Sequence, residues 1–147
     1  MGKKLISVET GLDKVGYKNV EPASGQTVYT SQWFTLNANG EGILATDTHR
    51  LVFLAFAGME RPDVVDDAVN LVTGGLTGIY GKFIATVGID GYDGGGTYAL
   101  DKPLKIVNGK LVDGVDGTDI IVARAMGALV NAQLTFACDV PVIVADI

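Results

Sequence analysis

Few side chains in this sequence could act as nucleophiles or bind a transition metal. His49 is the only histidine, Cys138 is the only cysteine, and the serines are Ser7, Ser24 and Ser31. None of these serines stands in the Gly-x-Ser-x-Gly elbow that exposes a catalytic hydroxyl. A zinc site needs about four cysteine, histidine or carboxylate ligands, which one cysteine and one histidine do not supply. We therefore expect no catalytic residue, no metal, no cofactor and no enzymatic activity.

Aspartate and glycine are concentrated in two segments. Residues 90–96 and the aspartates Asp113, Asp116 and Asp119 could bind Ca²⁺ through carboxylates and backbone carbonyls. Residues 90–96 lack the ligand alternation and terminal glutamate of an EF-hand loop, and Asp and Gly are the usual residues of turns. The sequence singles out no pair of aspartates with the opposed environments of paired acids, so a small hydrolase ranks as the last alternative. We interpret both segments as turns.

The charge of the chain argues against nucleic acid as a partner. Asp and Glu number 17 against 11 Lys and Arg, which gives a formal net charge of -6. Binding to DNA or RNA depends on Lys and Arg that neutralise phosphates, and here the basic residues are scattered. The longest apolar runs, about eight residues, fall short of the roughly 20 that a membrane helix needs. The start of the sequence lacks the apolar core of a signal peptide. We expect a soluble, non-secreted protein with neither nucleic acid nor membrane as partner.

The glycine content predicts a mainly β fold. Glycine supplies 20 of the 147 residues, against about 7% in an average domain. Such an excess favours many tight turns between short strands. Residues 1–26 mix polar and apolar side chains at no sustained period, which predicts an extended N-terminal arm that orders on a partner. Residues 27–147 are expected to form a single β-rich domain.

Aromatic and β-branched residues mark the expected strands, and one segment has helical spacing. Pro62 could begin a short helix, in which Val64, Val65, Ala68, Val69 and Val72 share a face and glycines 74–75 follow. Asn108-Gly109 between two apolar runs predicts a two-residue hairpin, with Ile106 opposite Leu111. The predicted strands cover residues 27–30, 33–36, 43–46, 51–57, 78–87, 104–107, 110–112, 120–123, 134–138 and 142–145.

Two sets of residues are candidates for contacts with other chains. The adjacent aromatics Trp33 and Phe34 fit the core of a sheet, which is the favoured interpretation. They also fit the anchor of an interface, because aromatic side chains dominate the energy of contacts between chains. The expected arm adds interface candidates at Lys3, Leu5, Ile6 and Val8. Cys138 lies within an apolar run and is expected to be a small buried hydrophobe.

The C-terminal half has an order of elements that resembles a known family. A glycine-rich strand at residues 76–87 leads to residues 96–104, which end in Lys102-Pro103-Leu104. The Asn108-Gly109 hairpin, an Asp-Gly turn and residues 119–125 follow, and an apolar strand closes the chain. This order resembles the capsid decoration, or cement, proteins of tailed bacteriophages. The family pattern has glycine where this sequence has Ala123.

The resemblance implies a fold and a mechanical function. It implies a small β-barrel, β-tulip-like or sandwich domain on the outer capsid surface of the virion, made in the host cytoplasm. There the protein would stabilise the head by bridging subunits of the major capsid protein, as a homo-oligomer, with a trimer expected. Two alternatives stay open: a tail-tube or head-completion protein, and a carbohydrate-binding β-module that stacks sugars on Trp33 and Tyr92.

Overall fold

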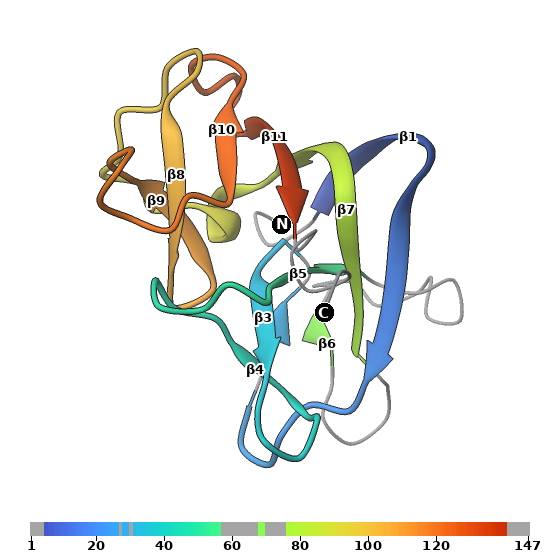
Figure 1. Ribbon diagram of the computed structural model, residues 1–147. Coiled ribbons are helices and arrows are strands. Elements are labelled where there is room, and N and C mark those ends of the chain that lie inside the picture. The colour runs from blue at the N-terminus through green and yellow to red at the C-terminus, as the bar shows by residue number, and fades with distance from the viewer. Residues whose placement is uncertain (1–4, 27, 30, 57–67, 70–75, 141–147) are drawn as a thin grey trace.

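The computed structural model describes residues 5–26, 28–29, 31–56, 68–69 and 76–140. Almost all of the regular structure in these residues is β, which confirms the predicted class (Figure 1). The strands are β1 (Leu5–Val20), β2 (Val28–Tyr29), β3 (Trp33–Leu36), β4 (Gly42–Leu44), β5 (Phe53–Phe56), β6 (Ala68–Val69), β7 (Leu76–Val87), β8 (Pro103–Val107), β9 (Lys110–Asp113), β10 (Ala123–Ala125) and β11 (Leu134–Val140). One 3₁₀ turn, η1 (Ile89–Gly91), follows β7.

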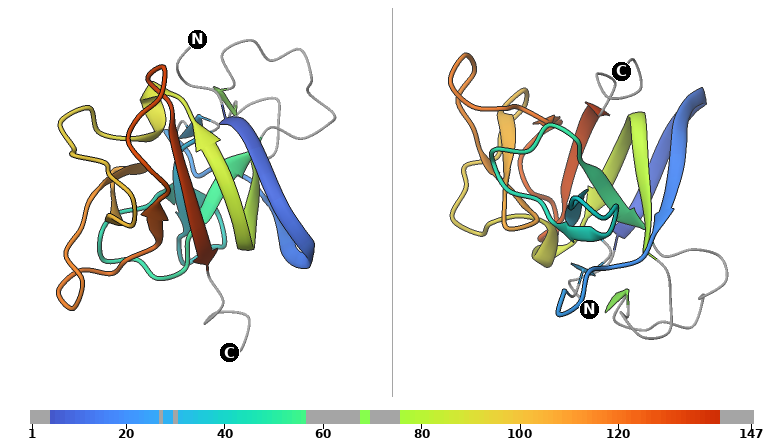
Figure 2. Two further views of the ribbon diagram at one scale, coloured as in Figure 1. Left: turned by 90° about the horizontal axis from the view of Figure 1, so that it is seen from above. Right: turned by 60° about the horizontal axis from the view of Figure 1, so that its bottom comes forward.

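Nine strands form one antiparallel sheet that curls into a half-barrel. Its order is β4-β3-β5-β7-β11-β10-β8-β9, and β1 pairs with β7 outside this path. Figure 2 shows β11, β7 and β1 side by side. The strands β2 and β6 form a separate two-stranded sheet. This curled sheet agrees with the expected small β-barrel-like domain.

Strand β7 joins the two halves of the sheet. Its residues 77–79 pair with β5, and its residues 81–87 pair with β11. The change of partner falls at Gly81, whose φ of 110° is a conformation that favours glycine. Opposite Gly81, the register of β1 shifts between Thr10 and Val15. An irregularity of this kind bends a strand, which helps the sheet to curl.

The core consists of two hydrophobic clusters on opposite faces of β3. Neighbouring side chains of a strand point to opposite faces, so Trp33 enters one cluster and Phe34 enters the other. Trp33 packs against Phe83 and Phe136, with ring centroids 6.5 and 5.9 Å apart. Phe34 stacks on Phe53 at 5.3 Å. Both Trp33 and Phe34 expose 0% of their surface, which confirms the prediction that they lie in the core of the sheet.

The Asn108-Gly109 hairpin forms as predicted. Ile106 lies opposite Leu111 and Val107 opposite Lys110, and both turn residues have positive φ, 50° and 81°. The turn also packs against the other half of the sheet. The Gly109 carbonyl accepts a hydrogen bond from the Trp33 amide at 2.9 Å. A Cβ at Gly109 would lie 2.6 Å from Leu44 Cδ2 and 3.3 Å from the Trp33 carbonyl oxygen, so a side chain here would displace Leu44 in addition to straining the backbone.

Three segments differ from the prediction or lie beyond the structure's description. Residues 5–20, expected in an arm, instead form β1, which satisfies backbone groups along the edge of β7. Ala68 and Val69, expected in a helix, form β6, which pairs with Tyr29 and Val28 of β2. Val69 is β-branched and so favours a strand. The rest of the helix candidate and the strand expected at 142–145 lie outside the described residues. The strand expected at 120–123 begins later, at Ala123.

Candidate functional site

The candidate nucleophiles are engaged separately in the fold. His49 is partly buried, and its Nδ1 accepts a hydrogen bond from the Thr46 amide at 3.0 Å, so it closes its own turn. Cys138 is buried as predicted, and its thiol points to the Phe83 carbonyl, with sulfur and oxygen 3.7 Å apart. Within the described ranges, no three His, Cys, Asp or Glu residues come together to hold a metal ion.

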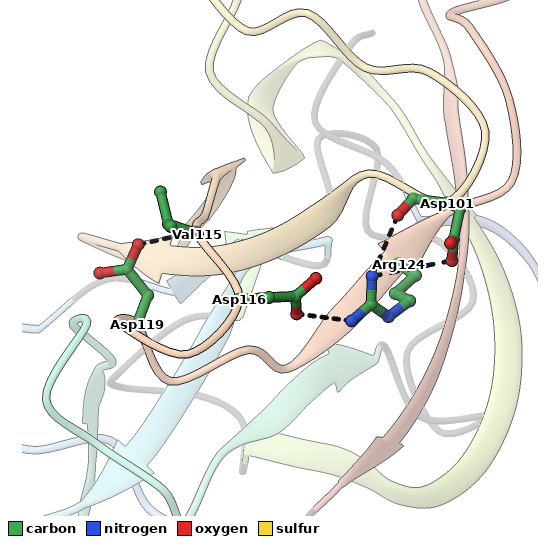
Figure 3. A network of polar contacts seen from close by, with 5 residues as sticks. All are labelled: Asp101, Val115, Asp116, Asp119 and Arg124. Atoms are coloured by element: carbon green, nitrogen blue, oxygen red, sulfur yellow. Dashed lines mark hydrogen bonds and ion pairs between the residues drawn. The ribbon is translucent and has the colours of Figure 1, made fainter.

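The aspartates of residues 113–119 stabilise loops. Asp113 accepts hydrogen bonds from the amide and hydroxyl of Thr97, both at 3.0 Å. Asp119 accepts one from the Val115 amide at 2.8 Å (Figure 3). It also lies 3.4 Å from the Lys105 ammonium. These carboxylates therefore point to different partners, as the turn interpretation expects.

Arg124 ties two more acidic residues together on the same side of the sheet. Its guanidinium contacts the Asp116 carboxylate at 2.5 Å and the Asp101 carboxylate at 3.7 Å (Figure 3). It also donates a hydrogen bond to the Asp101 carbonyl at 3.1 Å. Arg124 thereby joins β10 to the turn before β8 and to the loop after β9.

The glycine-dense segment 90–96 packs against a buried tyrosine. Tyr98 donates from its hydroxyl to the carbonyls of Asp93 and Leu111, at 2.6 and 3.1 Å. Burial raises the pKa of Tyr98 far above its usual value, and the negative charges of Asp113 and Asp93 raise it further. Asp93 itself is exposed and accepts a weak bond from the Gly95 amide at 3.4 Å. This geometry is that of a turn.

Exposed apolar side chains gather instead in the loop between β10 and β11, residues 126–133. Met126, Leu129 and Val130 expose 46%, 37% and 66% of their surface. The loop contains no charged residue. Leu100, 76% exposed, belongs to a turn that is hydrogen-bonded to the end of β10, because the Asp101 amide donates to the Ala125 carbonyl at 2.7 Å.

We name these four residues, Leu100, Met126, Leu129 and Val130, the apolar crest. The connection between β10 and β11 and the turn before β8 stand at the same end of the sheet, at the top of Figure 1. The other large apolar side chains that are exposed in the described ranges, those of Ile89, Val107 and Val115, belong to other segments. Large exposed apolar patches mark sites of interaction with other molecules, so we take the crest as the candidate contact surface of the described residues.

The tip of the β10–β11 loop has a defined backbone geometry. The amide and carbonyl groups of Val130 and Gln133 bond to each other at 2.9 and 3.1 Å. Asn131 and Ala132 between them have φ of 53° and 60°. The left-handed conformation costs a non-glycine residue roughly 1–2 kcal/mol. The Tyr92 hydroxyl donates to the Ala132 carbonyl at 2.9 Å and so holds this tip in place.

The residues proposed from sequence do not meet at the crest. Leu5 and Val8 pair with Val87 and Ala85 of β7, Ile6 lies at a register shift of β1, and Lys3 lies outside the described residues. Trp33 and Phe34 lie in the core, so they have no exposed surface with which to contact another chain. No sequence signal singles out the crest, because residues 22–40 lack charge just as residues 125–138 do, and they contain the buried Trp33 and Phe34.

Comparison of the chain with protein-family models, with curated protein sequences and with solved structures finds no match. In the part of the chain that the structure describes, no helix has the length and apolar character to cross a membrane.

Proposed function

We propose that this chain is a structural protein of a bacteriophage virion, which binds the outer capsid surface and bridges subunits of the major capsid protein. The observation that carries the proposal is the apolar crest: exposed apolar side chains gathered at one end of a chain with a net charge of -6. The capsid as partner comes from the resemblance of the C-terminal half to decoration proteins.

The use of reactive side chains within the fold supports a mechanical function. His49 closes a turn, Cys138 lies in the core, and Asp113 and Asp119 stabilise loops. A catalytic centre needs such groups within hydrogen-bond reach of a common point. We therefore propose that the protein acts by shape and contact.

The net charge suits a position outside the shell. A chain with this acidic balance is repelled by polyanions such as the packaged DNA, and its charge favours solubility before assembly. We propose that the protein binds each capsid position as a trimer. The weak contacts of the individual copies would then combine into a stronger attachment. The protein would be made in the host cytoplasm and then join the virion.

One observation favours a second virion role, in the tail tube or at the head opening. Strand β1 has 16 residues, and the described strands pair with it only through β7. A free strand edge can pair with another chain, as in rings built from sheets. Assembly of the purified protein alone into rings or tubes, seen by electron microscopy, would select this role. The carbohydrate alternative loses its stacking surfaces, because Trp33 and Tyr92 expose 0% and 3%.

The proposal can be tested by co-sedimentation with capsid shells. Shells would be assembled from the major capsid protein of the same phage genome and mixed with increasing amounts of the purified chain. We expect saturable binding, regular added density on the outer surface by electron cryomicroscopy, and shells that disassemble at higher temperature. Unchanged shells after mixing at saturating concentrations would overturn the proposal.

A further inference from the structure

We infer that Asn39, in the turn between β3 and β4, is a site of spontaneous deamidation in the folded protein, whereas the fold shields Asn108 from the same reaction. These two asparagines precede a glycine in the sequence. The inference concerns a modification of the chain and does not depend on the proposed function. It follows from the surroundings of the Gly40 and Gly109 amides, because their nitrogens are the nucleophiles of the reaction.

The reaction needs only the chain itself and water. The backbone nitrogen of the glycine loses its proton and attacks the side-chain carbonyl carbon of the asparagine. A C–N bond forms, the bond to the side-chain nitrogen breaks, and ammonia leaves as a five-membered imide closes. Water then opens the imide to aspartate or isoaspartate, which places a negative charge where a neutral amide stood. Glycine favours the attack because it has no side chain in the way and its backbone rotates freely.

The Asn39-Gly40 pair lies in an open turn. Both residues are exposed, and a Cβ at Gly40 would meet no atom within 4 Å. The Gly40 amide donates to the Asn37 carbonyl at 2.9 Å, and the Asn37 side chain accepts from the amides of Asn39 and Glu41. All of these contacts lie within residues 37–41. Exposed local structure of this kind opens at a low free energy, so the Gly40 nitrogen can turn toward the Asn39 side chain.

The Asn108-Gly109 pair consists of the same residues in a closed setting. Asn108 is exposed, but Gly109 is buried. The Gly109 amide donates to the Ala45 carbonyl at 2.8 Å, and the Gly109 carbonyl accepts from the Trp33 amide at 2.9 Å. Both partners lie more than sixty residues earlier in the chain. Attack on the Asn108 side chain turns the Gly109 nitrogen away from Ala45, so it requires the hairpin to separate from the residues beside it.

The fold should therefore separate the two rates. A reaction that occurs from an opened state follows the population of that state. Local opening costs close to nothing in exposed turns and approaches the whole stability of the domain in its core. Separation of the hairpin breaks two backbone hydrogen bonds and uncovers the buried Gly109, so fewer than about one in ten molecules should be open at Asn108. Asn39 should then react at least about tenfold faster than Asn108.

The test compares the two sites within one sample. The purified chain is kept folded in mildly alkaline buffer, and portions taken over time are digested at acid pH and measured by mass spectrometry. Deamidation raises the mass of a peptide because OH replaces NH₂, whereas isomerisation at an Asp-Gly pair leaves the mass unchanged. A second sample in urea, in which both pairs are unfolded, is the matched control for sequence. Asn39→Gln retains the amide but cannot form the five-membered ring, so it identifies the signal from Asn39.

In the folded sample we expect deamidation at Asn39 to be at least about tenfold faster than at Asn108, with similar rates at the two sites in urea. Asn39→Gln should remove the fast reaction. Equal rates in the folded sample, or a faster reaction at Asn108, would overturn the inference. A tenfold difference that persists in urea would also overturn it, because the sequence and not the fold would then be its cause. Each of these results leaves the proposed function standing.

Discussion

Gly78→Ala tests the packing on which the curled sheet depends. Gly78 lies in β7 opposite Ala55 of β5, below the stacked rings of Phe34 and Phe53. A Cβ at this position would lie 2.5 Å from Phe34 Cζ and 2.5 Å from Phe53 Cβ. Phe53 Cβ is attached directly to the backbone of β5, so it can move only if the strand moves. The Phe34 ring is fully buried and has little room to rotate.

The expected cost follows from these two contacts. Overpacking a well-filled core typically costs about 1–3 kcal/mol, and the rigidity of both neighbours favours the upper part of this range. Alanine also restricts the unfolded chain, which returns about 0.4–1 kcal/mol. We therefore expect a net destabilisation of about 2 kcal/mol, out of a total stability of about 5–15 kcal/mol. For a domain of this size, that lowers the Tm by roughly 4–8 °C.

The assay is denaturant unfolding followed by tryptophan fluorescence, with a thermal scan by circular dichroism. Trp33, the only tryptophan, is buried in the neighbouring cluster and reports on the core. Gly94→Ala is the matched control, because an added Cβ there meets no atom within 4 Å. We expect the control to be neutral or stabilised by up to about 1 kcal/mol. A Gly78→Ala variant as stable as the control would falsify the packing of Phe34 and Phe53 over β7.

Three further predictions concern loops and charges. Burial raises the pKa of Tyr98 in the folded state. The stabilisation from this pKa difference is complete below the unfolded pKa of about 10 and declines as the pH rises above it. The free energy of unfolding should therefore fall less steeply at alkaline pH in Tyr98→Phe than in wild type, and equal slopes would contradict this. Ala132→Gly relieves the left-handed strain and should change stability by between 0 and about +1 kcal/mol, whereas a clear loss in Tm would mean that Ala132 is unstrained. Arg124→Ala removes exposed ion pairs and should cost less than about 1 kcal/mol in denaturant unfolding, less still at high salt; a larger, salt-independent loss would refute this.

The elements that sequence predicts well are those that local chemistry determines. The hairpin at Asn108-Gly109 needs only two residues that tolerate positive φ between two apolar runs, and its register followed from that alone. Strand β1 could not be found in this way. Its partner β7 lies more than fifty residues further along the chain, and edge pairing through the backbone requires no apolar alternation.

The candidate site was hidden for a related reason. Exposure depends on the whole fold, and the Leu, Val and Ala side chains of residues 126–133 are of the same types as those in the neighbouring strand β11. Trp33 and Phe34 show the opposite case. They have the composition of an interface anchor, but β3 lies between two core clusters and both side chains are covered. The missing charge of residues 125–138 does not distinguish this stretch either, because residues 22–40 are also uncharged.

A continuous set of contacts connects the apolar crest to the core. Tyr92 bonds to the crest at Ala132, and its ring packs edge-on against Tyr98 with centroids 5.4 Å apart. Tyr98 in turn bonds to the Leu111 carbonyl in β9, and the β8–β9 turn is held by the Trp33 amide. Tyr92, Tyr98 and Trp33 are buried, so these contacts connect the exposed tip at Ala132 to β3 through the interior of the domain.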